Sequence, residues 1–240
     1  MMVLIPLLLA AAPPPIVGLD KPKKVQVGKL GKSELAAGDV TVRCTDLGKV
    51  MLVEVQDPGL MGARDAWLKK KTGEAMPPCD GSDVDVTRIE GLGGYGYVAG
   101  TRGDFVFGSS ADAFGDRMGL RVFSATTGAM LLDVERSLQK PATLTLEGPS
   151  LWLRYNEAIP ATCDPVGAEA ETCWKQLRAD AKIPEDVAIK APPCGPAFKG
   201  KQLLPGAALI AVPVEVDLNA PLKTRVKRFR AGEATCDVAP

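Results

Sequence analysis

Between residues 84 and 158, short apolar stretches alternate with turn-forming residues almost without interruption. The intervening Gly, Pro, Asn, Asp and Ser recur at about the 8 to 12 residue spacing that is typical of antiparallel sandwiches and barrels. The pattern therefore predicts a mainly β fold, either an antiparallel sandwich or barrel-like sheets. The expected strands cover residues 84–89, 95–98, 105–107, 120–123, 130–134, 142–146 and 151–155.

Flanking segments add three strands and two short helices to this expectation. Alternating or apolar runs predict strands at 24–27, 40–44 and 50–55. Residues 63–71 place Ala66, Trp67 and Lys70 at helical spacing and end in lysines, which predicts a short helix. Residues 168–181 predict a second helix that stops before a proline, with one face formed by Cys173, Trp174, Leu177 and Ala181.

The composition changes along the chain and suggests four parts. We expect a signal peptide at 1–12, a Pro-rich linker at 13–23 and a β-rich core domain at 24–159. Residues 160–240 form an appended α+β subdomain, in which disulfides staple an irregular Pro-rich region. Within it, strands are expected near 207–216 and 222–229.

The N-terminus reads as a targeting segment. Residues 1–12 form an apolar run that ends in alanines, and three prolines follow, which is the size of a signal-peptide core and too short for a membrane span. No Lys or Arg precedes the run, and Pro13 is awkward directly after a cleavage point. We expect a secreted or periplasmic protein without a transmembrane anchor once the signal is removed. The alternative is a cytosolic protein with a frayed apolar N-terminus.

Six cysteines, an even number, fit disulfides formed in an oxidising compartment. Since none of them has the C-x-x-C spacing, a redox centre or zinc knuckle is disfavoured. Six cysteines allow 15 pairings. Pairing neighbours in sequence gives Cys44 with Cys79, Cys163 with Cys173, and Cys194 with Cys236, and the main alternative joins Cys173 to Cys194.

Charge is balanced, with 29 basic and 29 acidic residues and no long block of one sign, so we expect no nucleic-acid partner. The most basic segment, residues 223–230, could in principle grip an anionic surface. Its near-alternation favours a strand with one solvated face whose charges protect it against edge pairing.

The chain contains no histidine, which removes Ser-His-Asp and Cys-His catalysis and every His-containing metal site. We predict neither a metal nor a cofactor. Acid and base chemistry would have to come from a carboxylate pair facing across a cleft, and scattered solvated acids are the simpler interpretation. The carboxylates considered are Asp112, Asp116, Glu135, Glu147 and Glu157.

Three short motifs suggest binding sites that their context disfavours. Residues 91–96 match G-x-G-x-x-G, but a strand rather than a helix is expected next, so no phosphate cradle forms. Residues 80–85 carry calcium-type oxygen ligands but fail the EF-hand spacing and read as a polar turn. Arg102, Gly103 and Asp104 form a tripeptide that adhesion receptors read on exposed loop tips, and its residues are common enough to arise by chance.

Residues 120–132 read as a hairpin whose turn, Thr126-Thr127-Gly128, needs the positive φ of glycine. Locally this resembles the strand, A-x-T-G turn, strand unit of quinoprotein-type propeller blades. A propeller needs at least four blades and the unit is not repeated here, so the resemblance implies no propeller function.

These observations favour a non-catalytic exported module that recognises a protein or glycan partner, or an envelope component. The alternative is a carboxylate-dependent extracellular hydrolase acting, for example, on a glycan. An enzyme should show a deep cleft with two facing acids, whereas a shallow surface with exposed Tyr95, Tyr97 or Phe105 would favour binding.

Overall fold

The computed structural model describes residues 16–60, 62–81, 86–89, 92, 96–111, 117–137, 140–198 and 208–238. The predicted signal peptide and the first residues of the predicted linker lie outside these ranges.

Strands dominate the described residues, so the mainly β prediction is confirmed. The first strands are β1 (Ile16–Val17), β2 (Lys24–Lys32), β3 (Asp39–Asp46), β4 (Val50–Gln56), β5 (Ala63–Lys70) and β6 (Val86–Arg88). The middle strands are β7 (Gly96–Arg102), β8 (Phe105–Ala111), β9 (Arg117–Ser124) and β10 (Met130–Ser137). The last elements are β11 (Ala142–Glu147), β12 (Ser150–Pro160), α1 (Ala170–Asp180), β13 (Ile189–Lys190), α2 (Cys194–Phe198), β14 (Ala208–Asp217), the 3-10 helix η1 (Leu222–Thr224), β15 (Lys227–Phe229), β16 (Gly232–Glu233) and β17 (Thr235–Val238).

One sheet of 15 strands contains almost all of these elements, in the order β1-β11-β12-β10-β9-β8-β7-β5-β4-β3-β2. Its pairs are antiparallel except for β1 with β11. β14 joins on the free side of β12 and pairs in turn with β15 and β17, so the C-terminal residues extend the same sheet.

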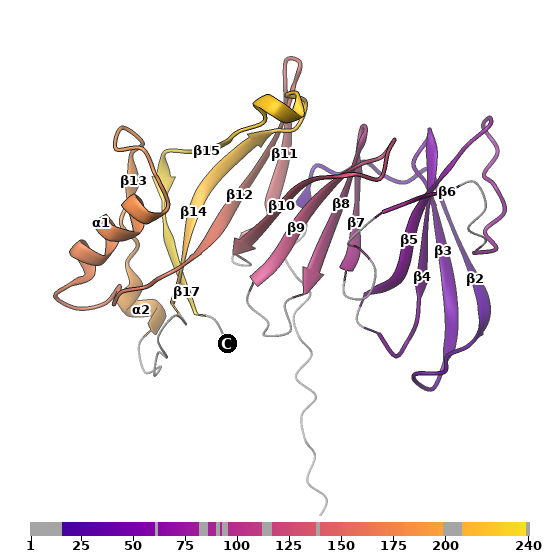
Figure 1. Cartoon of the computed structure of the whole chain (residues 1–240), viewed down its shortest axis with the longest axis horizontal. Coiled ribbons are helices and arrows are strands. Elements are labelled where there is room, and N and C mark those ends of the chain that lie inside the picture. The colour runs from indigo at the N-terminus through magenta and orange to yellow at the C-terminus, as the bar shows by residue number, and fades with distance from the viewer. Residues whose placement is uncertain are drawn as a thin grey trace, which may run out of the picture.

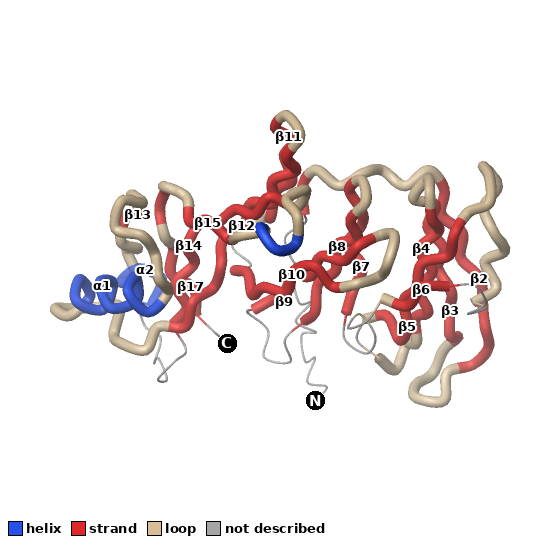
Figure 2. Tube along the Cα trace, turned by 45° about the horizontal axis from the view of Figure 1, so that its top comes forward, coloured by secondary structure: helices blue, strands red, loops and turns tan. Residues whose placement is uncertain are grey.

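The sheet bends so strongly that its two ends cover opposite faces of its middle (Figures 1 and 2). Between β5 and β7 only Ala63 and Gly96 pair, and the sheet turns there. Val106 and Phe123 pack with residues of β4 and β5, whereas Phe107 and Val122 pack with residues of β12 and β14. The strands β8 and β9 are therefore buried on both faces, which explains their consecutive apolar residues.

The helix predicted at residues 63–71 is wrong, because this segment is the strand β5 between β4 and β6. Ala66 and Leu68 face the middle strands, while Trp67 faces the opposite way, into a cluster with Met51. Because both faces of β5 are buried, its apolar residues do not alternate with polar ones. The spacing that imitates a helix is a by-product of this two-sided burial.

The second predicted helix is confirmed as α1, which buries Cys173, Trp174 and Leu177. Arg178, in the last turn of α1, donates hydrogen bonds from Nη2 to the carbonyl oxygens of Pro184 and Val187, which follow the helix. The short helix α2 lies in a segment that the prolines suggested would be irregular. Neither of these helices has the length and apolar character to span a membrane, and the same holds for the rest of the described chain.

Three disulfides connect the cysteines in the pairing expected from sequence order. Cys44–Cys79 fastens to β3 the loop that covers the outer face of β3 to β5. Cys163–Cys173 ties α1 to the chain leaving β12, and Cys194–Cys236 ties α2 to β17. Three disulfides are typical of a protein from an oxidising compartment.

Pro213 lies inside β14, although proline has no N–H to give to a ladder. Its carbonyl oxygen accepts the N–H of Arg230, so its nitrogen points to the same side of the strand. On that side β17 pairs with residues 208–211 and β15 with residues 214–216, which leaves Pro213 at the gap between them. Little pairing is therefore lost.

Candidate functional site

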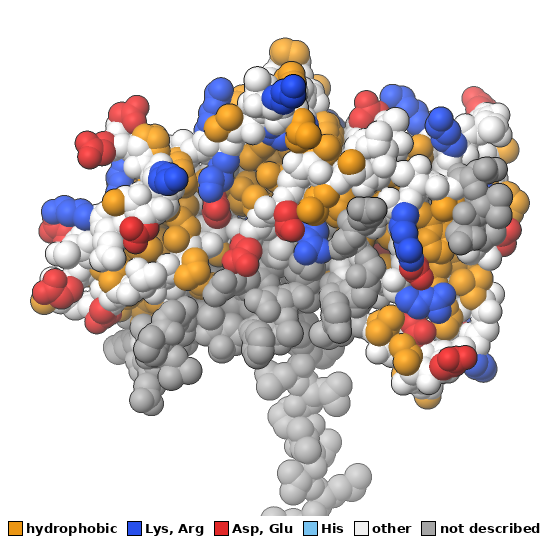
Figure 3. All heavy atoms as spheres, viewed as in Figure 1, with side chains coloured by type: hydrophobic (Ala, Val, Ile, Leu, Met, Phe, Trp, Pro, Cys, Tyr) orange, Lys and Arg blue, Asp and Glu red, His pale blue; other side chains and the backbone are white. Residues whose placement is uncertain are grey.

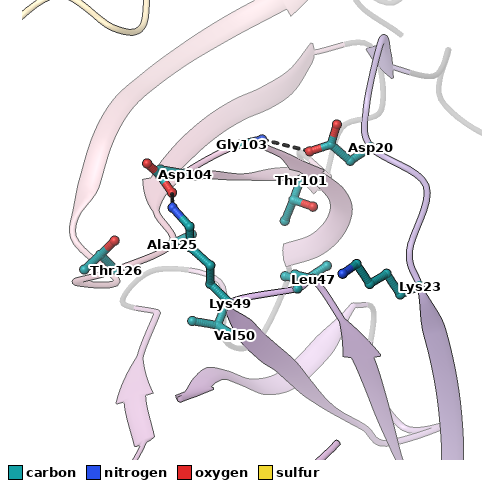
Figure 4. A pocket seen from close by; sticks show the side chains of 11 residues that line it. Asp20, Lys23, Leu47, Lys49, Val50, Thr101, Gly103, Asp104, Ala125 and Thr126 are labelled. Carbon is teal, nitrogen blue, oxygen red and sulfur yellow. Dashed lines mark hydrogen bonds and ion pairs between the residues drawn. The ribbon is translucent and has the colours of Figure 1, made fainter. Parts of the chain in front are cut away.

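A pocket of about 330 Å³ opens where several connections between strands meet. We call it the loop-end pocket. Its walls come from the segment before β2 and from the turns β3–β4, β7–β8 and β9–β10. The lining residues are Asp20, Lys23, Leu47, Gly48, Lys49, Val50, Thr101, Gly103, Asp104, Ala125 and Thr126 (Figure 4).

Side chains hold two of these turns in shape. In the β3–β4 turn, Oδ1 of Asp46 accepts the N–H of Gly48, which adopts a φ of 92°. In the β9–β10 turn, Oγ of Ser124 accepts the N–H groups of Thr126 and Thr127. This is the predicted hairpin, and its Gly128 has the expected positive φ of 69°. Asp and Ser stabilise turns in this way because their short side chains replace a backbone acceptor.

Ion pairs connect walls that are distant in sequence. Asp20 accepts hydrogen bonds of 2.8 Å from Nη1 of Arg102 and from the N–H of Gly103. Nζ of Lys49 lies 3.1 Å from Oδ1 of Asp104. The tripeptide at residues 102–104 does lie on an exposed turn, but both of its charged side chains bind within the protein. Its structural role is to join β7–β8 to the neighbouring walls.

A buried ion pair lies beside the β3–β4 turn. Nζ of Lys71 lies 2.7 Å from Oδ2 of Asp46, and the two side chains are only 4% and 8% exposed. The hydrogen bond from the Lys71 ammonium lowers the pKa of the Asp46 carboxyl below its usual value. Asp46 therefore stays ionised and anchors the β3–β4 turn through both of its oxygens.

Three further polar residues line the pocket, of which Lys23 and Thr126 are exposed and Thr101 is largely buried. Figure 4 shows the Lys23 ammonium and the Thr101 hydroxyl directed towards the same space, with Thr126 on the opposite rim. Within the described residues, Lys23 forms no ion pair or side-chain hydrogen bond. An ammonium beside hydroxyls suits a ligand that brings a carboxylate or carbonyl oxygen together with further polar groups.

A second polar pocket, of about 350 Å³, lies beside Tyr97 and contains two carboxylates, Asp39 and Asp57. Hydrogen bonds from Lys29 and Lys32 lower the pKa of Asp39 to about 2. Hydrogen bonds from the Ser33 hydroxyl and from the N–H of residue 59 lower the pKa of Asp57. A glycosidase acid needs a raised pKa, so these two carboxylates are poorly suited to that role.

The carboxylates singled out from the sequence are not brought together where they are described. Glu147 pairs with Arg154 and Glu157 with Lys227. Because Glu147 lies opposite Ser150, these two acids are seven residues apart along β12, about 23 Å. Glu135 is exposed on β10, and Asp112 and Asp116 lie outside the described residues. Nor do the described His, Cys, Asp and Glu residues include a group of three able to hold a metal ion.

The glycine motif is described only at Leu92 and Gly96. The strand β7 begins at Gly96, as expected for a β connection. A Cβ on Gly96 would lie 2.6 Å from the carbonyl oxygen of Leu92, which is fully buried. Close backbone packing therefore accounts for this glycine.

The other expected binding residues are only partly described. Asp80 and Gly81 follow the Cys44–Cys79 disulfide, and residues 82–85 lie outside the described ranges. Tyr97 is 43% exposed and Phe105 is half-buried, whereas Tyr95 is not described.

No family model matches the chain, and no curated protein or solved structure matches it. Its function therefore has to be inferred from the residues of the site.

Sequence reasoning missed the loop-end pocket because its walls come from segments about 20 to 100 residues apart. Asp20, Lys23, Lys49 and Thr126 look like ordinary solvated residues in sequence. The turn signals were visible, since each wall contains a glycine or a Ser-Thr run between strands. What the sequence did not reveal is that the bent sheet brings these turns to one end.

Proposed function

We propose that the chain is an exported, non-catalytic binding module that holds a polar ligand, from a protein or glycan of the cell envelope, in the loop-end pocket. The observation that carries the proposal is the pocket itself, in which internal ion pairs fix the walls and leave the Lys23 ammonium facing the cavity, with Thr101 in its wall and Thr126 on its rim. Turns that are fixed by a rigid sheet are common positions for binding residues.

Binding is favoured over hydrolysis by the state of the carboxylates at the two polar pockets. Asp20 and Asp104 are engaged with Arg102 and Lys49, and the pKa values of Asp39 and Asp57 are lowered. Acids that already have cationic or hydrogen-bond-donating partners orient and fix a site more readily than they donate protons.

The test begins with capture of partners by the exported chain from the envelope of its source cells, followed by titration of the captured peptide or glycan. Lys23→Ala combined with Thr126→Val should weaken the affinity at least about tenfold, because an ammonium and a hydroxyl contact are removed. Lys24→Ala is the matched control, since Lys24 is exposed on β2 and does not line the pocket.

Equal affinity of the pocket variant and the control would show that the ligand binds elsewhere. Reproducible turnover of a substrate, lost when one carboxylate is replaced, would instead establish the hydrolase alternative.

A further inference from the structure

A second feature of the surface lies at the tip formed by the β11–β12 hairpin and the chain that follows β14. Leu222 and Val226, in and after η1, are 64% and 62% exposed, and Leu146 on the hairpin is 60% exposed. The side-chain amide of Asn219 donates a hydrogen bond of 2.6 Å to the carbonyl oxygen of Pro149, which joins the two segments. In the space-filling view, hydrophobic and basic side chains gather over this end (Figure 3).

The charge of this tip is one-sided. Residues 218–231 contain five cations and no acid, namely Lys223, Arg225, Lys227, Arg228 and Arg230. Lys227 pairs with Glu157, and Arg230 pairs with Glu215. Among the described residues, Lys223 and Arg228 form no ion pair, and the guanidinium of Arg228 rests over the Trp152 ring. Two exposed positive charges therefore remain uncompensated.

The neighbouring acids are already engaged. Glu147 lies 2.8 Å from Nη2 of Arg154, and Asp217 accepts hydrogen bonds from Ser150 and from the N–H of Asn219. Each of these acids therefore has its own partner, including the half-exposed Glu147 beside the turn of the hairpin, and neither pairs with Lys223 or Arg228.

The shape of the loop is built in, because Arg225 points inward. Its Nη2 donates hydrogen bonds to the carbonyl oxygens of Leu218 and Ala220. The guanidinium therefore fixes the loop, in which Leu222, on η1, and Val226, directly after Arg225, stay exposed. Exposed large apolar side chains on a fixed loop, surrounded by cations, are typical of a surface that meets lipid.

We propose that this basic tip, consisting of Leu222, Lys223, Val226 and Arg228, docks the protein on an anionic phospholipid surface. The apolar residues enter the interface between headgroups and acyl chains, and the two cations contact lipid phosphates. A soluble polyanion would use the cations but would leave the apolar side chains of Leu222 and Val226 in water. The lipid surface accounts for both features.

The experiment is co-sedimentation of the full chain with vesicles of phosphatidylcholine alone or mixed with phosphatidylglycerol. The chain should bind the mixed vesicles, and raising the salt concentration should weaken the binding. Leu222→Ser with Val226→Ser, and separately Lys223→Glu with Arg228→Glu, should each lower the partition about tenfold or more. All samples keep the same N-terminus, so its contribution cancels.

Matched controls carry the same changes at the other end of the sheet. Val27→Ser with Leu35→Ser alters two apolar residues that are similarly exposed, and Lys24→Glu with Lys70→Glu alters two exposed cations. Equal losses in tip and control variants, or no binding to mixed vesicles, would overturn the proposal. Binding to heparin that survives Leu222→Ser with Val226→Ser, without vesicle binding, would identify a polyanion surface and overturn it as well.

Discussion

The carboxylate of Glu54 on β4 accepts a hydrogen bond from the backbone N–H of Val98 on β7, across the bend of the sheet. Glu54 is almost fully buried at 6% exposure, and burial raises its pKa to about 7, although Arg43 and the Val98 N–H act in the opposite direction. An acid thus lies where the first strands pack on the middle ones.

Replacing this acid should stabilise the protein in a pH-dependent way. Because the folded-state pKa lies above the unfolded value, ionisation opposes folding as the pH rises from about 4.5 to about 7. Glu54→Gln keeps an acceptor for Val98 and removes the charge. We expect a gain of up to about 3 kcal/mol at about pH 8 and little change near pH 4.5, measured by thermal unfolding. Glu34→Gln, at an exposed position, should change neither, and an equal gain at both pH values would contradict the burial argument.

Lys71→Ala should destabilise the fold by about 2 to 3 kcal/mol, because it leaves the Asp46 carboxylate buried without its cation. Denaturant unfolding measures the loss. Lys175→Ala removes an exposed partner of Glu171 on α1 and should have little effect. Equal losses of stability in the two variants would show that burial of the Lys71–Asp46 pair is not the cause of the loss.

The three disulfides should differ in their contribution according to the length of chain that each closes. Cys194–Cys236 and Cys44–Cys79 span 42 and 35 residues, whereas Cys163–Cys173 spans 10. Loop-closure entropy predicts losses of about 4 kcal/mol for either long bridge and about 3 kcal/mol for the short one when both cysteines become alanine. Denaturant midpoints of the three double variants test the order, which would be refuted if loss of the short bridge cost the most.

Gly128→Ala should be more damaging than Gly148→Ala, although both glycines have positive φ values, of 69° and 59°. A Cβ at Gly148 meets open space and costs only the left-handed conformation, about 1 kcal/mol. A Cβ at Gly128 would also collide with the carbonyl oxygen of Arg88 on β6. We expect a loss above about 2 kcal/mol there, and equal melting temperatures of the two variants would exclude this contact as the cause.

The strands between residues 84 and 158 were predictable because turn residues mark their ends. The segment 63–71 was not, because Trp67 and Leu68 are buried on opposite faces of β5 and leave no alternation to read. The basic segment 223–230 was only partly predicted, since the strand is limited to Lys227–Phe229 after η1. Local patterns do not reveal which neighbours will cover the second face of a strand.

The site was less predictable than the fold. The disulfide pairing follows sequence order and needs only neighbouring cysteines, whereas the loop-end pocket depends on how Asp20 reaches Arg102 and how Lys49 reaches Asp104. Both contacts require the bend between β5 and β7, and a single residue pair there gives no sequence signal.

The pairing of β12 with β14 also has a consequence for biogenesis. One edge of β12 pairs with β14, and the two strands together bury Leu153 and Tyr155. A ribosome produces β14 only after α1, α2 and their connecting loops. A nascent chain therefore carries an uncovered strand edge while these residues are made, and uncovered edges invite aggregation. We expect the polypeptide to be held by a chaperone during synthesis and to fold after release.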